Sequence, residues 1–317
     1  MELLAYYAHS LSQPRRCAAD FAELADLGVA GIIHSTHEQD LGQWPKDIAR
    51  AIEQAERAGL GVYLQFGRYG GVFTGSWLVP STFAVRHPDA CLVDLWGNAQ
   101  PICCLNSEQF RDWYFGTTEA LLRAFPGAGV VLDEPKAAGL PCACETCRTI
   151  AGSESPNGSA SVKQLTEVRT DSVVRFCADA LASIKGVRSG LGTVLLVLPR
   201  DEELFDRLCR LDHLDRFGTK PYWLLRHESL DFVAQCVARV KDLASENEVG
   251  SAVAVQNFGV SEEREPELRR ALDIAVGARP DCLIFHYYGR NNDRPDRVWE
   301  ITREALAKAA RLPPFST

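Results

Sequence analysis

The chain contains eight short apolar segments, and most of them are followed by a segment with helical periodicity. This alternation constrains the fold strongly, because strands that alternate with helices pair in parallel through crossover helices. The segments are near-continuous apolar runs, as expected for strands covered on both faces. They occupy residues 2–10, 30–38, 61–70, 127–135, 192–200, 214–223, 250–259 and 281–289.

Eight such units in 317 residues predict an α/β protein that is a single (β/α)8 TIM barrel, with one domain over residues 1–317. A long loop is expected after the third strand, and a cysteine-containing loop after the fourth. The competing architecture is a doubly wound open sheet, which usually has a glycine fingerprint after its first strand. The segment "YYAHSLSQ" has none, so the barrel is favoured.

Charge and hydropathy exclude two classes of partner. The formal net charge of −8 argues against binding that is driven by phosphate neutralisation, so no nucleic-acid partner is expected. No apolar segment approaches the roughly 18 residues that would span a bilayer. The start "MELLAYYAHS" lacks the features of a signal peptide. We therefore expect a cytoplasmic protein with no membrane partner.

Polar and aromatic side chains gather where the predicted strands end, which is where barrel enzymes carry their active sites. Aromatic rings offer apolar faces to sugar rings, and amides, imidazoles and hydroxyls can bond sugar hydroxyl groups. Such a mouth suits a carbohydrate. The candidate substrate-binding residues are Tyr7, His34, Gln65, Arg68, Lys220, Tyr222, Trp223, Gln256, Asn257, His286 and Tyr288.

Several of these segments together resemble the TIM-barrel glycoside hydrolases. The resemblance rests on "VVLDEP…CACETC", "LDRFGTKPYW", "VAVQNF" and "LIFHYYG…RPDRVW". It is closest to the looser relatives of the clan that places its acid/base glutamate at the end of strand four. The resemblance implies that Glu134 is the general acid/base of a glycosidase.

Asp133 precedes Glu134 directly, and adjacent residues of a strand point to opposite faces. The two carboxylates share a site only if the strand bends or ends between them, and Pro135 makes an end there plausible. Mutual repulsion in a shared site would raise one pKa and favour a protonated acid near neutral pH. The alternative is that Asp133 caps a neighbouring loop and only Glu134 is functional.

The sequence departs from the clan at the seventh strand, where the nucleophilic glutamate is replaced by Gln256 and Asn257. An amide cannot serve as the nucleophile of double displacement. Another carboxylate could act instead, or the substrate's own acetamido group could attack. The third alternative is a carbohydrate-binding protein or a non-hydrolytic sugar enzyme that uses histidine or lysine. The candidate carboxylates are Asp133, Asp201, Glu202 and Glu38.

The cysteines suggest a second site. Cys142, Cys144 and Cys147 follow the fourth strand, and Cys103 or Cys104 could supply a fourth thiolate. This pattern resembles the zinc cluster of the family 42 β-galactosidases, which implies a structural zinc ion. The alternative is a reduced loop without metal. Catalysis itself is expected to need no cofactor.

Together these features predict a glycoside hydrolase-like enzyme that cleaves a small glycoside or oligosaccharide, with Glu134 as general acid/base and Asp133 or another mouth carboxylate assisting. The alternatives are a sugar isomerase or lyase and a carbohydrate-binding pseudoenzyme. The expected partner is a small saccharide. Whether the chain forms a homo-oligomer is left open.

Overall fold

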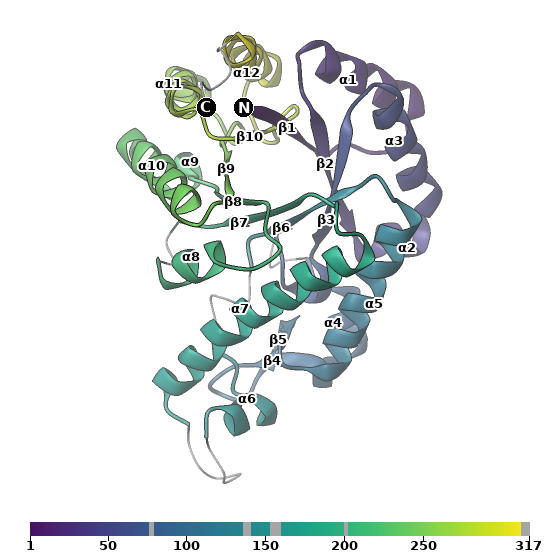
Figure 1. Ribbon diagram of the computed structural model, residues 1–317, viewed down its shortest axis with the longest axis vertical. Helices are drawn as coiled ribbons and strands as arrows, with labels where there is room; N and C mark the ends of the chain where they lie inside the picture. Colours follow the sequence, from purple (N-terminus) through teal and green to yellow (C-terminus); the bar gives the residue numbers. More distant parts are fainter. Residues whose placement is uncertain (76–78, 136–140, 153–159, 200–201, 312–317) are drawn as a thin grey trace.

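The centre of the computed structural model is a closed barrel of eight parallel strands (Figure 1), as predicted. The structure describes residues 1–75, 79–135, 141–152, 160–199 and 202–311. Around the barrel the strands run in the order β1-β10-β9-β8-β7-β6-β3-β2. Their bounds are β1 (Glu2–Tyr7), β2 (Gly31–His37), β3 (Gly61–Gly67), β6 (Gly129–Asp133), β7 (Thr193–Val197), β8 (Arg216–Thr219), β9 (Gly250–Ala254) and β10 (Cys282–His286).

Alternate residues of the strands fill the barrel interior, because successive strand side chains point to opposite faces. Leu4 and Tyr6 of β1 pack there with Ile33, Val131 and Leu196. The intervening residues face the surrounding helices in a much larger apolar cluster. The helices thus cover the outside of the barrel, and the loops that follow the strands collect at one end of it.

The helices begin where the sequence provides suitable first residues. Pro14, Pro45 and Pro295 stand at first helical positions, and the Ser107 and Ser229 side chains cap others. The bounds are α1 (Pro14–Asp26), α2 (Glu38–Gln43), α3 (Pro45–Arg57), α4 (Thr82–Arg86), α5 (Glu108–Ala124), α6 (Glu145–Ile150), α7 (Val162–Val187), α8 (Glu202–Cys209), α9 (Trp223–Arg226), α10 (Leu230–Glu246), α11 (Glu265–Ala278) and α12 (Pro295–Ala310), with 3-10 turns η1 (Tyr69–Gly71), η2 (Pro88–Ala90) and η4 (Glu262–Arg264).

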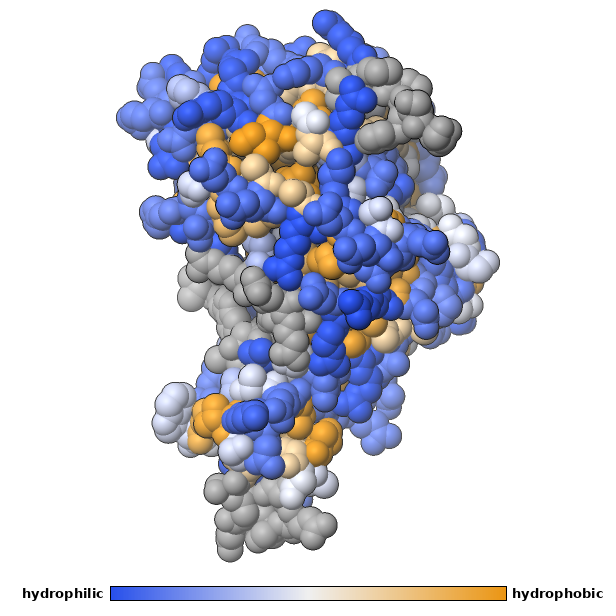
Figure 2. Space-filling model, turned by 60° about the vertical axis from the view of Figure 1, so that its left-hand side comes forward, coloured by the Kyte–Doolittle hydropathy of each residue, from blue (hydrophilic) through white to orange (hydrophobic). Residues whose placement is uncertain are grey.

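The long segment after β3, which is predicted from the sequence to be a loop, contains a β-hairpin. Its strands β4 (Cys91–Val93) and β5 (Ala99–Cys103) pair antiparallel. Together with α6 and the start of α7, this hairpin forms an extension from the barrel (Figure 1). The extension is the narrower lower end of the molecule in Figure 2, where hydrophobic and hydrophilic side chains are intermixed. None of the helices in the described ranges is long and apolar enough to cross a membrane.

Candidate active site

The acid pair lies where β6 ends. The strand stops at Asp133, and Glu134 has a left-handed backbone with φ 48°. This turn cancels the usual alternation, so both carboxylates reach the same ammonium group. Lys220 Nζ lies 2.8 Å from Asp133 Oδ2 and 2.9 Å from Glu134 Oε1. Asp133 and Glu134 therefore share one site, and the Asp133 side chain contacts barrel residues rather than capping a loop.

Asp133 forms the buried floor of this site. Its Oδ2 accepts hydrogen bonds from the Tyr6 hydroxyl at 3.0 Å and from the Gln65 amide. Its Oδ1 lies 3.0 Å from Lys220 Nζ. Asp133 is only 1% exposed, whereas Glu134 is 7% exposed. Glu134 is thus the carboxylate of the pair that is nearer to solvent.

Aromatic rings surround the ammonium group. Lys220 Nζ lies 5.3 Å from the ring centroid of Tyr6 and 5.2 Å from that of Tyr222, distances at which cations are attracted to ring faces. His286 stacks on Tyr6 with centroids 4.9 Å apart. Phe258 packs edge-on against His286 and Tyr222. These rings limit water around the three charged groups.

The charges fix the protonation of the lysine. Burial alone would lower the pKa of Lys220, but Asp133 and Glu134 together raise it well above its usual value. Lys220 therefore carries its proton at neutral pH. Burial is the main influence on Asp133 and raises its pKa. The positive charge of Lys220 lowers this pKa and the negative charge of Glu134 raises it, so that the pKa of Asp133 is raised on balance. Burial and the Lys220 charge lower the pKa of His286 to about 3, so its imidazole is neutral.

Three of the predicted substrate-binding residues form hydrogen bonds with backbone groups. Arg68 donates to the carbonyls of Gly71 and Val79. Gln256 Oε1 accepts from the first amides of α9, and Asn257 bonds both backbone groups of His286.

Glu38 accepts hydrogen bonds from the Gly70 and Phe83 amides and from the Ser81 hydroxyl. Two further candidates, Asp201 and the Glu202 side chain, lie outside the described residues.

Other predicted residues point away from the acid pair. The Tyr7 hydroxyl donates to Asp20 of α1, and Trp223 is fully buried in the outer core. Tyr288 packs against Trp299 of α12. His34 lines a separate cavity at the ends of β1 and β2. The structure thus brings together Gln65, Lys220, Tyr222 and His286 around Asp133 and Glu134.

Two residues of the site were not predicted from the sequence: Tyr6 and Phe258. Tyr6 and Tyr7 are adjacent aromatics at the end of β1, and only the inward one can reach Asp133. The two adjacent tyrosines indicated that this strand end could contribute an aromatic ring to the site. A short apolar run, however, does not reveal which of its residues points into the barrel.

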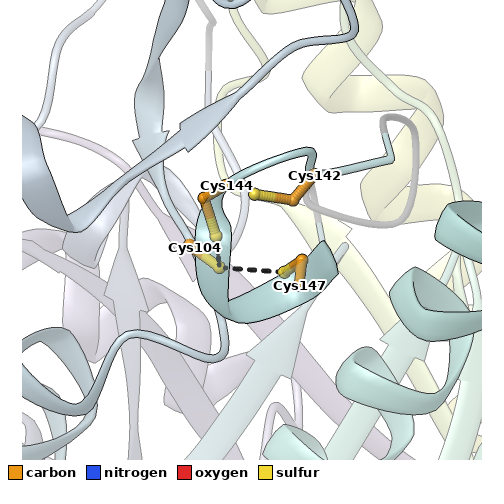
Figure 3. A group of neighbouring side chains, drawn as sticks. All are labelled: Cys104, Cys142, Cys144 and Cys147. Atoms are coloured by element: carbon orange, nitrogen blue, oxygen red, sulfur yellow. Dashed lines mark hydrogen bonds between the residues drawn. The ribbon is translucent and has the colours of Figure 1, made fainter. Parts of the chain in front are cut away.

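The cysteine cluster is a separate site in the extension. The sulfur atoms of Cys104, Cys142, Cys144 and Cys147 converge, all within 4.8 Å of one another (Figure 3). Cys104 Sγ lies 3.7 Å from Cys144 Sγ and 3.5 Å from Cys147 Sγ. Tetrahedral zinc with bonds of about 2.3 Å would place its sulfur ligands about 3.8 Å apart, so the four thiols fit this ion.

The structure excludes Cys103 from the cluster. It lies opposite Cys91 in the β4–β5 ladder and packs in the main core. Cys104 follows β5 directly and packs in a separate small cluster with Cys142 and Cys147. Asn106 supports the cluster, because its backbone amide donates to Cys104 Sγ and its side chain donates to Cys147 Sγ.

The chain matches no known sequence family and no characterised protein by sequence. Solved structures match its fold. A β-galactosidase from Rahnella sp. R3 is 15% identical with a TM-score of 0.64, and the match covers 98% of this chain and 57% of that one. A β-galactosidase from Bacillus circulans sp. alkalophilus is 14% identical with a TM-score of 0.67, and the match covers 97% of this chain and 55% of that one. The catalytic domain of a β-amylase from Paenibacillus polymyxa is 9% identical with a TM-score of 0.64, and the match covers 99% of each chain.

The chain therefore has the (β/α)8 barrel fold that these glycoside hydrolases share, which confirms the fold implied by the sequence resemblance. It spans just over half the length of the two β-galactosidases. At such low identity the likeness establishes the fold alone.

Proposed function

We propose that the chain is a glycoside hydrolase-like enzyme that cleaves a small glycoside or oligosaccharide, with Glu134 as general acid/base. The observation that carries the proposal is the convergence of Asp133 and Glu134 on Lys220 at the end of β6. Glu134 is one of eight described non-glycine residues with positive φ, and its left-handed backbone is what turns both carboxylates toward Lys220.

The charge balance of this site supports proton donation. Two buried carboxyl groups share a single ammonium, so retaining one proton on the pair neutralises the cluster. Such a proton belongs to the coupled pair rather than to one residue. Glu134 is the more exposed member, and it would deliver the proton to the glycosidic oxygen. Asp133 would assist by fixing Lys220 and by sharing the proton.

One candidate for the second catalytic group is engaged elsewhere: Glu38 accepts three hydrogen bonds that hold the loop around Gly70 and Ser81. Gln256 is an amide that caps α9. Attack by an acetamido group of the substrate would need no nucleophile from the protein. We therefore include N-acetylhexosaminides among the substrates to be tested.

A second candidate function is carbohydrate binding without turnover. It is favoured by the ion pair between Glu134 and Lys220 and by the missing glutamate at the seventh strand of the barrel. A non-hydrolytic enzyme that uses Lys220 as a base is less well supported, because the raised pKa of Lys220 keeps it protonated.

Assay of the purified chain against a panel of aryl glycosides and aryl N-acetylhexosaminides separates these functions. We expect turnover of at least one member, and a loss of about 10²–10⁴ in kcat in Glu134→Gln. The matched control is Glu248→Gln, an exposed glutamate with φ 56° before β9, which should retain full activity. Binding without turnover would favour the second function, and normal turnover by Glu134→Gln would refute the role of Glu134.

We also propose that Cys104, Cys142, Cys144 and Cys147 hold a structural zinc ion. Four thiolates leave no open coordination position, so the ion would brace the extension and take no part in catalysis.

A further inference from the structure

A cavity of about 440 Å³ lies at the C-terminal ends of β1 and β2, outside the acid cluster. Its volume is within the range of small-molecule sites. The walls come from the segment after β1, from the end of β2 and from α2 and α3. Ser35 lines it and stands opposite Gln65 in the β2–β3 ladder, and Gln65 in turn bonds Asp133. The cavity is therefore one strand away from the proposed catalytic pair.

His34 gives this cavity an unused polar group. The side chain is 7% exposed, and neither ring nitrogen makes a hydrogen bond of good geometry with any of the described residues. Burial lowers the pKa of His34 to about 4, so the ring is neutral at pH 7. A neutral imidazole offers one donor and one acceptor, which is the complement of a hydroxyl group. Buried polar groups without partners are rare and call for an explanation.

Trp44 supplies an aromatic face at the same cavity. It lies between α2 and α3 and is 50% exposed, although tryptophan is usually more deeply buried. An indole ring presents a flat apolar surface that suits the C–H face of a sugar ring.

The charges around the cavity disfavour an anionic ligand. Asp40 and Asp47 line it, against a single guanidinium from Arg290. The remaining titratable residues of its lining are Tyr7, His9, His34 and His37. Burial lowers the pKa of His9, so this ring adds no positive charge at neutral pH.

We propose that this cavity binds a neutral hydroxylated ring, a monosaccharide unit, which stacks on Trp44 and exchanges a hydrogen bond with His34. The site needs no chemistry at Glu134, so the proposal goes beyond the glycosidase function and does not depend on it.

Calorimetric titration of the full chain with glucose, galactose, mannose and N-acetylglucosamine tests the proposal. We expect at least one of them to bind with a dissociation constant on the order of millimolar. Trp44→Ala and His34→Phe should each weaken binding about tenfold. Trp96→Ala is the matched control, because Trp96 is 84% exposed at the β4–β5 turn and should leave binding unchanged.

Glu134→Gln distinguishes this site from the barrel mouth. Binding that survives Glu134→Gln but falls in Trp44→Ala supports the proposal, whether or not any glycoside is hydrolysed. If His34→Phe does not fold, as judged by its melting temperature, the exposed Trp44 decides the question. The proposal is overturned if no sugar binds at about 100 mM, if Trp44→Ala binds as the parent chain does, or if only Glu134→Gln loses binding.

Discussion

At the residue scale, the candidate active site depends on how one lysine compensates two carboxylates. Lys220 is 3% exposed and contacts both members of the acid pair. Removing one partner of a buried ion pair leaves an uncompensated charge, which is far more destabilising than loss of an exposed pair. The lysine therefore has a structural role as well as an electrostatic one.

Lys220→Met should lower the free energy of unfolding by about 3–5 kcal/mol at pH 8. The loss should be smaller at pH 5. A carboxyl group whose folded pKa is raised stabilises the fold below its unfolded pKa, and that stabilisation is lost as the pH rises through the folded pKa. The raised pKa of Asp133 would rise further without the ammonium, so the carboxyl takes up a proton more readily at pH 5 than at pH 8. Urea unfolding at both pH values measures this.

The control is Lys308→Met, which removes an exposed pair with Asp273 and should change stability by less than about 1 kcal/mol. Equal losses for the two variants, or a larger loss at pH 5 than at pH 8, would show that Lys220 does not compensate the acid pair.

At the element scale, the eight strands of the barrel could be predicted because most of them are near-continuous apolar runs that alternate with helical segments. The β4–β5 hairpin could not, since strands of three and five residues are too short to show a period. Its turn carried a local signal in Asp94 and Gly97. The Asp94 carboxylate accepts bonds from the Trp96 and Asn98 amides, and Gly97 has φ 88°.

The hairpin holds Cys103 in its ladder and leaves Cys104 to the cysteine cluster, and this gives a prediction for the metal content. Protein produced with zinc in the medium should contain about one zinc ion per chain. Cys104→Ser should lose the ion and melt at a lower temperature, because metal binding contributes to folding. Cys103→Ser is the matched neighbour and should keep the metal. Elemental analysis that finds no zinc in the parent chain, or equal zinc in both variants, would contradict the proposed site.

At the scale of the whole molecule, closure of the barrel decides which strand-end residues meet. The sequence indicated that polar groups would gather at one end. It did not indicate the inward or outward phase of each strand, because strands buried on both faces lack polar alternation. Tyr7 and His34 therefore line a separate cavity, whereas Tyr6 forms a hydrogen bond with Asp133. Gln256 and Asn257 do follow β9, but their side-chain amides form hydrogen bonds with backbone groups.

Close strand packing also gives a stability prediction for the barrel. A Cβ atom at Gly218 of β8 would lie 2.4 Å from the Ala252 carbonyl oxygen and 2.7 Å from Leu196 Cδ2. Gly218→Ala should therefore cost about 1–3 kcal/mol through overpacking. Gly186→Ala in α7, where a Cβ meets nothing within 4 Å, should be neutral or stabilising. Thermal unfolding of both variants would contradict this if Gly218→Ala were the more stable.

The central claim is that Glu134 donates a proton to the leaving group, and comparing leaving groups tests it most directly. A dinitrophenyl glycoside departs without protonation, whereas an alkyl glycoside of the same sugar needs an acid. We predict that Glu134→Gln lowers kcat/KM by about 10²–10⁴ for the alkyl glycoside and by less than about tenfold for the dinitrophenyl glycoside. Equal losses for the two substrates would contradict proton donation by Glu134.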